Sequence, residues 1–164
     1  MDTLVGYQRG FTLIELLVVI AIIGALSSVM LASVTVTRSK SNDSYRIQTL
    51  IQLRIALELY YGSNNSYPVG CWNYLAKDGP NYIPALAPSY IAELPRDRQE
   101  GATCPGGIGD GSNLRTFYYC SNGTDYKVNV CSENPVPATS VWWDLFRPGY
   151  AFKICSSTFS CQNF

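Results

Sequence analysis

The chain of 164 residues contains no histidine. Histidine is a common general base, zinc ligand and activator of nucleophiles, so its absence weakens all three kinds of site together. The sequence also has no C-x-x-C cysteine pair, no phosphate-binding glycine motif and no low-complexity repeat. Its 12 basic and 12 acidic residues balance to zero net charge, so composition does not indicate nucleic acid as a partner. We therefore predict no catalytic residues, no metal ligands and no enzyme activity.

One long stretch is almost free of charge. Between Phe11 and Val34 the only ionisable side chain is Glu15. A helix of this length, at about 1.5 Å per residue, extends about 36 Å and exceeds the roughly 30 Å of a bilayer's hydrocarbon core. A carboxylate in such a helix costs about 2.5–3.5 kcal/mol or more. The segment is therefore predicted to span a membrane, and Glu15 is predicted to have a functional partner.

The string Gly-Phe-Thr-Leu-Ile-Glu at residues 10–15 follows a short polar leader and opens the apolar run. It resembles the amino-terminal signal of type IV prepilins and of type II secretion pseudopilins, and the likeness is closest from Gly10 to about Tyr61. The resemblance implies that a prepilin peptidase cuts after Gly10 and methylates the new amino terminus at Phe11. It also implies that Glu15 attracts the amino terminus of a neighbouring subunit during assembly. The alternative is that Glu15 reaches the membrane interface near the start of the helix.

The expected fold is α+β and pilin-like, with a long amino-terminal helix packed on a small antiparallel sheet domain with disulfides. We predict a leader at residues 1–10, a transmembrane and filament-core helix at 11–34, its amphipathic continuation at 35–61, and an extracytoplasmic globular domain at 62–164. The resemblance implies a precursor that crosses the cytoplasmic (inner) membrane once, and a mature form in a cell-surface pilus or a periplasmic pseudopilus. The implied partners are prepilin peptidase, further copies of this chain, other pilins and the assembly platform.

The amphipathic continuation carries two apolar rows at helical spacing. One row holds Ile47, Ile51 and Ile55, and the other holds Leu50, Leu53, Leu57 and Tyr60. Two rows predict two packing partners, the chain's own domain and a neighbouring subunit; the alternative is burial on both sides by the chain's own domain. Arg54 and Glu58 lie between the rows at a spacing that favours a weak ion pair. The helix is expected to end near Gly62.

Three strands are expected, at residues 115–120, 125–131 and 150–155. The dipeptide Asn122-Gly123 between the first two predicts a hairpin. A short helix is expected around Tyr74. The aromatic cluster at residues 141–146 fits core packing or a surface adhesion patch.

The six cysteines all follow the apolar run, and an even number in a small outer domain predicts disulfides. They are Cys71, Cys104, Cys120, Cys131, Cys155 and Cys161. Six cysteines allow 15 pairings, which sequence alone does not resolve. Cys120 and Cys131 would not face each other in a tight hairpin, which argues against their direct pairing. The resemblance favours a Cys155–Cys161 bridge, because many pilins close a loop near the carboxyl end.

Oxygen-bearing side chains that could bind calcium are scattered over the outer domain. They are Asp97, Asp110, Ser112, Asn113 and Asp125. Their spacing does not match an EF-hand, and aspartates in polar loops are usually turn formers. We therefore expect no cofactor, and calcium stays a candidate without assigned ligands.

Three functions compete. The first is a structural subunit of a type IV pilus-like filament, with roles in adhesion, motility or DNA uptake. The second is a type II secretion pseudopilin, which shares the same amino-terminal signal. The third is a single-pass, membrane-anchored binding domain that never polymerises. The six cysteines and the aromatic-rich outer domain favour the first.

Overall fold

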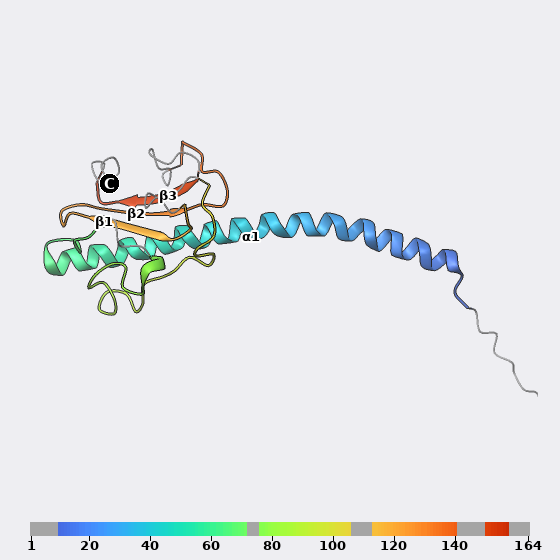
Figure 1. The fold of residues 1–164 in the computed structure, drawn as a ribbon, viewed down its shortest axis with the longest axis horizontal. Coiled ribbons are helices and arrows are strands. Elements are labelled where there is room, and N and C mark those ends of the chain that lie inside the picture. Colours follow the sequence, from blue (N-terminus) through green and yellow to red (C-terminus); the bar gives the residue numbers. More distant parts are fainter. Residues whose placement is uncertain (1–9, 72–75, 106–112, 141–149, 158–164) are drawn as a thin grey trace, which may run out of the picture. The chain divides into compact units, whose positions relative to one another are not determined.

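The computed structural model describes residues 10–71, 76–105, 113–140 and 150–157, except the side chains of residues 29–32 and 77 (Figure 1). Its elements are α1 (Leu13–Asn64), the short 3₁₀ helix η1 (Ala76–Asp78), and the strands β1 (Phe117–Ser121), β2 (Tyr126–Cys131) and β3 (Ala151–Cys155). The chain forms two compact units, one ending at Arg38 and one beginning at Ser39. These units do not test the predicted division into leader, membrane helix and outer domain, which stays a prediction.

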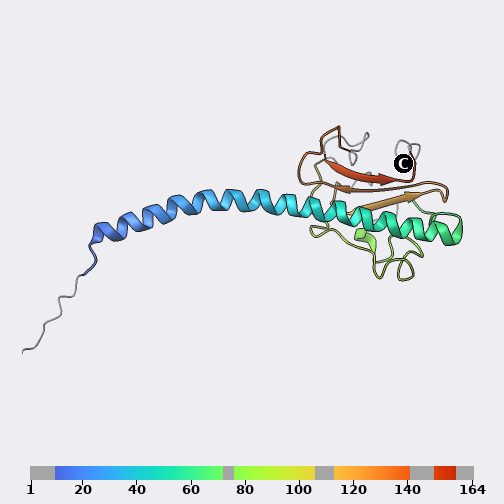
Figure 2. The same ribbon diagram turned by 180° about the vertical axis from the view of Figure 1, so that it is seen from behind.

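In the second unit, the carboxyl-terminal part of α1 lies between the sheet and the loop of residues 80–95 (Figures 1 and 2). Its buried face is the predicted row of leucines: Leu50, Leu53 and Leu57 are all 0% exposed. The isoleucine row behaves differently, since Ile51 is half-buried and Ile55 is 55% exposed. The chain's own domain therefore buries one row, and the alternative of burial on both sides is wrong at Ile55.

The helix runs two residues beyond the predicted end at Gly62, to Asn64. Asn65 adopts a left-handed φ of 53°, and its backbone N–H donates to the carbonyl of Tyr61 at 2.8 Å. A left-handed residue with this hydrogen bond is a common way to end a helix, and asparagine tolerates it better than most residues. The stop is therefore made by Asn65 rather than by Gly62.

The three strands form one antiparallel sheet in the order β1-β2-β3. All three predicted strands are confirmed, each within two residues of its expected start. The predicted turn is confirmed as well: Gly123 has a φ of 92°, and the Asn122 side-chain oxygen accepts from the backbone N–H groups of Thr124 and Asp125. This side chain satisfies two turn donors, so the hairpin register is fixed locally.

The faces of the sheet alternate as the pleat requires. Apolar and aromatic side chains of one face share a core with α1 and the 80–95 loop; on the strands these are Phe117, Tyr119, Tyr126, Val128, Val130, Phe152 and Ile154. The other face carries a second buried cluster of Tyr118 with the cysteines at 71, 104, 120 and 131. The predicted α+β class, with a long helix packed on a small disulfide-bonded antiparallel sheet, is confirmed.

Two predictions fall outside the described residues. They are the short helix around Tyr74 and the aromatic cluster at 141–146.

Replacing Leu53 by alanine should lower the free energy of unfolding by about 2–5 kcal/mol, because the substitution leaves a cavity beneath the sheet. The matched control is Ile55→Ala on the exposed side of the same helix, which should change it by about 0.5 kcal/mol or less. Urea denaturation of the detergent-solubilised chain measures both. Equal effects of the two variants would contradict the burial described above.

Candidate functional site

The start of α1 is closed by reciprocal hydrogen bonds between Thr12 and Glu15. The Glu15 Oε2 atom accepts from the Thr12 backbone N–H at 2.8 Å and from the Thr12 hydroxyl at 2.7 Å. In return the Glu15 backbone N–H donates to Thr12 Oγ1 at 3.3 Å. This is a capping box, whose signature of Thr, two residues and Glu is legible in the sequence. Glu15 thus has an intrachain partner that the sequence reasoning missed.

The residues before this box are accessible. Phe11 is 91% exposed, and Gly10 has open space around it. The predicted cleavage between Gly10 and Phe11 and the methylation of Phe11 stay predictions, since residues 1–9 lie outside the described residues.

The first unit exposes its apolar side chains. Leu13 is 84%, Ile14 is 70% and Leu26 is 64% exposed. By length and composition, α1 contains a window with a mean hydropathy of 2.6 that is long and apolar enough to cross a membrane. No part of that window is buried within the chain. The described side chains of the first unit therefore form an apolar surface that the chain itself does not bury.

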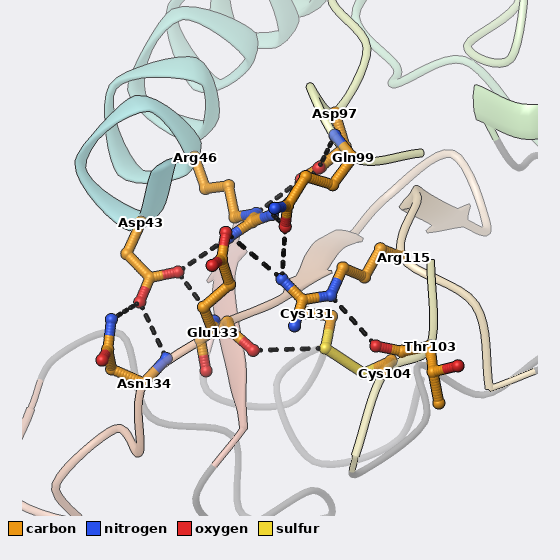
Figure 3. Close-up of a disulfide and its surroundings, with 11 residues drawn as sticks. Asp43, Arg46, Asp97, Gln99, Thr103, Cys104, Arg115, Cys131, Glu133 and Asn134 are labelled. Atoms are coloured by element: carbon orange, nitrogen blue, oxygen red, sulfur yellow. Dashed lines mark hydrogen bonds and ion pairs between the residues drawn. A yellow bond between two sulfur atoms is a disulfide. The ribbon is translucent and has the colours of Figure 1, made fainter. Parts of the chain in front are cut away.

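In the second unit, Arg46 on the buried side of α1 lies at the centre of an ionic cluster (Figure 3). Its Nε and Nη2 atoms donate to the two carboxylate oxygens of Asp97 at 2.5 and 2.9 Å. Its Nη1 atom donates to Asp43 at 2.8 Å and to Glu133 at 3.1 Å. Burial alone lowers the pKa of Arg46, but hydrogen bonds and negative charge, first from Asp97 and then from Asp43 and Glu133, outweigh it and raise the pKa above its ordinary value.

Asp43 also holds the segment that follows β2. Asp43 accepts the backbone N–H groups of Glu133 and Asn134 at 2.8 and 3.0 Å. Arg115 extends the cluster, with its Nη1 atom 3.3 Å from Glu133 and its Nε atom donating to the Thr103 carbonyl at 3.0 Å. The cluster therefore joins α1 to two distant parts of the sequence, the segment before β1 that contains Asp97 and the segment after β2 that contains Glu133.

A disulfide lies beside the ionic cluster (Figure 3). Cys104 is joined to Cys131, with 5.8 Å between Cα atoms, and Cys71 is joined to Cys120, with 4.1 Å. The expectation that Cys120 and Cys131 are not paired with each other is confirmed. Cys155 is also disulfide-bonded, whereas Cys161, its expected partner, lies outside the described residues.

The expected ion pair between Arg54 and Glu58 is wrong. The Glu58 carboxylate instead accepts from the Tyr67 hydroxyl at 3.1 and 3.2 Å and from the Tyr126 hydroxyl at 3.4 Å. Burial first, and the Glu58 charge second, raise the pKa of Tyr67 to about 12. The hydroxyls of Tyr67 and Tyr126 thus bind the Glu58 carboxylate, which helical spacing alone would pair with Arg54.

The calcium candidates have other roles where they are described. Asp97 binds Arg46, and Asp125 accepts a hydrogen bond from Ser156 Oγ at 2.9 Å. Asn113 is exposed, and Asp110 and Ser112 lie outside the described residues. Within the described ranges, no group of three or more His, Cys, Asp or Glu side chains could hold a metal ion. Calcium binding therefore stays a prediction without ligands.

Comparisons with known proteins match part of the chain. Residues 6–31 match the family model described as the prokaryotic N-terminal methylation motif. The chain is 35% identical over 98 residues to the type II secretion system core protein G of Pectobacterium carotovorum, covering 56% of this chain and 63% of that protein. It is 32% identical over 95 residues to the core protein G of Klebsiella michiganensis, covering 55% and 67%.

A third relative is the type IV wide pilus major component PilA4 of Thermus thermophilus. The chain is 42% identical to it over 59 residues, which cover 36% of this chain and 45% of that protein. The chain spans under two thirds of the length of the Pectobacterium relative. No solved structure matches the chain.

Replacing Arg46 by methionine should lower the free energy of unfolding by about 3–5 kcal/mol, because it leaves buried carboxylates without their cation. The matched control is Arg54→Met, which removes an exposed arginine from the same helix and should cost about 0.5 kcal/mol or less. Adding Asp97→Asn to Arg46→Met should recover part of the loss, since one stranded charge is then removed. Urea denaturation measures all three, and equal costs for the two arginine variants would contradict the cluster's role.

The raised pKa of Tyr67 predicts a loss of stability in alkali. The fold favours the neutral phenol, whereas the unfolded chain releases this proton near pH 10. The stabilisation is therefore fully present below about pH 10 and is lost as pH rises toward about 12. Tyrosinate absorbance, with Tyr67→Phe to identify the group, measures the titration. Glu58→Gln should lower the pKa of Tyr67, and an unchanged titration would contradict the effect of that carboxylate.

Proposed function

Since the chain belongs to the family of type IV pilins and type II secretion pseudopilins, we propose that it is a subunit that polymerises through α1 after cleavage behind Gly10. The observation that carries the proposal is the start of α1. An accessible Gly10–Phe11 bond precedes a capped glutamate, and the part of α1 that follows, up to residue 38, has every described side chain exposed. Such a helix is stable in lipid as a precursor and among other helices in a filament.

Glu15 has a stated role in this proposal. In the precursor its carboxylate is held by the Thr12 backbone N–H and hydroxyl, so it enters the membrane already hydrogen-bonded. After cleavage, the ammonium group at Phe11 supplies a positive charge near the same position of a neighbouring subunit. A carboxylate and an ammonium group removed from water together are favourable only as a pair, which fixes the stagger between subunits.

Of the two filament types, we propose the secretion pseudopilus. The support is that the Pectobacterium and Klebsiella relatives carry the name type II secretion system core protein G. The surface pilus is the second candidate, supported by the name of the Thermus relative and by the six cysteines of this chain. In either filament the chain is structural and is not an enzyme, and its partners are prepilin peptidase, other pilins and the assembly platform.

Mass spectrometry separates these candidates. The proposal predicts a peptide that begins at N-methylated Phe11 in the membrane fraction, and a surface pilus predicts the same peptide in sheared cell-surface material. Functional protein that retains residues 1–10 would contradict both and would leave the anchored binding domain.

Variants of Glu15 distinguish its charge from its capping role. Glu15→Gln keeps the acceptor that a capping box needs but removes the charge, whereas Thr12→Val removes the hydroxyl and keeps the charge. If pairing with a neighbour drives assembly, Glu15→Gln should abolish filaments and Thr12→Val should retain them. Normal filament yield from Glu15→Gln, measured by immunoblot of the assembled fraction, would contradict the pairing.

A further inference from the structure

The side of α1 away from its own core carries an uncovered ridge, which we define as Ile51, Arg54 and Ile55. Ile55 is 55% exposed, Arg54 is exposed and Ile51 is half-buried. Because Glu58 is engaged by the hydroxyls of Tyr67 and Tyr126, Arg54 forms no ion pair within the part of the chain that the structure describes. The ridge therefore offers an apolar contact beside an unpaired cation.

The same unit has a groove with the opposite charge at its rim. The groove has a volume of about 830 Å³ and is lined by Tyr45 and Gln52 of α1 and by residues between Pro80 and Arg96. Its lining is largely alanine, proline, leucine and isoleucine, and Ile91 is one of these residues. The exposed Glu93 contributes a carboxylate that has no ion-pair partner among residues 10–71, 76–105, 113–140 and 150–157.

The other charge at the groove is already occupied. The Nε atom of Arg96 is 2.8 Å from Glu100, and its Nη2 atom donates to the Ala76 carbonyl. Glu93 is therefore the charge that remains available to a partner. A partner that fits the groove carries a cation to pair with Glu93 and, beside it, an apolar side chain to contact the apolar lining.

The ridge and the groove of one chain cannot contact each other. Gln52 lines the groove, and Arg54 is two residues further along α1, which places it about 160° round the helix from Gln52. Arg54 thus faces away from the groove of its own chain. Two copies can join ridge to groove, and each then still has one ridge or one groove free. A contact between different surfaces of identical subunits continues indefinitely unless it closes into a ring.

We propose that a second copy of this chain occupies the groove, with its Arg54 paired to Glu93 and its Ile55 against the apolar lining. The inference rests on the proposed function, since it names the contact between outer domains in the filament. The charges match in sign, and both are otherwise unpaired among the described residues. Pairing at the rim of an apolar contact gives specificity and register, because a like charge at the same place is repelled.

The test exchanges the two charges in the full-length chain, in a host that carries a pilin assembly machinery. The variants are Arg54→Glu, Glu93→Arg and the double variant with both. Each single variant should lower the ratio of filamentous to membrane-dispersed protein at least about tenfold, because it places like charges together. The double variant should restore that ratio to within about threefold of the original. The matched control is Lys40→Glu, an equal charge reversal at an exposed position on the same helix, which should leave the ratio unchanged.

Three outcomes would overturn the inference: unaffected single variants, no recovery in the double variant, or an equal loss in Lys40→Glu. Failure to recover would indicate that a different protein occupies the groove. None of these results touches the proposed function, which fails instead if the unaltered chain forms no filaments. Urea denaturation of the detergent-solubilised variants checks folding, and all four should match the unaltered chain because the altered positions are exposed.

Discussion

The side chain of Arg46 is 1% exposed, and carboxylates from three separate stretches of chain balance its charge. Removing one member of such a cluster costs about 3–5 kcal/mol. A whole domain is stable by only about 5–15 kcal/mol. The cluster therefore couples α1 to the segment before β1 and to the segment after β2. Neither segment can move away from α1 without exposing a buried charge or leaving it unpaired. The cluster therefore fixes the position of the helix relative to the sheet.

Features that depend on neighbouring residues could be predicted from the sequence. The leucine row, the Asn122-Gly123 hairpin and the strands follow from spacing and turn chemistry, which operate within a few residues. The cysteine pairings could not be predicted, because they depend on how distant segments approach. Arg46 shows the same limit, since Asp97 is 51 residues away. The expected Arg54–Glu58 pair was wrong for a related reason: helical spacing places the two side chains together, but Tyr67 and Tyr126 arrive from elsewhere and bind Glu58.

Glu15 illustrates a signal that was present and overlooked. Its spacing from Thr12 is that of a capping box, and the structure forms one. An acidic residue in an apolar helix needs a hydrogen-bond or charge partner both before and after assembly. The capping box supplies that partner within a single subunit, so assembly in the proposed filament exchanges one set of hydrogen bonds for another. The cost of holding the charge in lipid is correspondingly smaller before the neighbour arrives.

The disulfide between Cys71 and Cys120 has a mechanical consequence. It joins residues 49 positions apart in the sequence. A pulling force that unfolded the outer domain could not draw out the chain between them, which would otherwise extend by about 170 Å at roughly 3.3–3.6 Å per residue. The Cys104–Cys131 bridge begins inside that loop and ends beyond it, so it also limits the chain that follows Cys120. Under tension the part of the domain from Cys71 to Cys131 would lengthen little, so extension would be confined to the chain on either side of it.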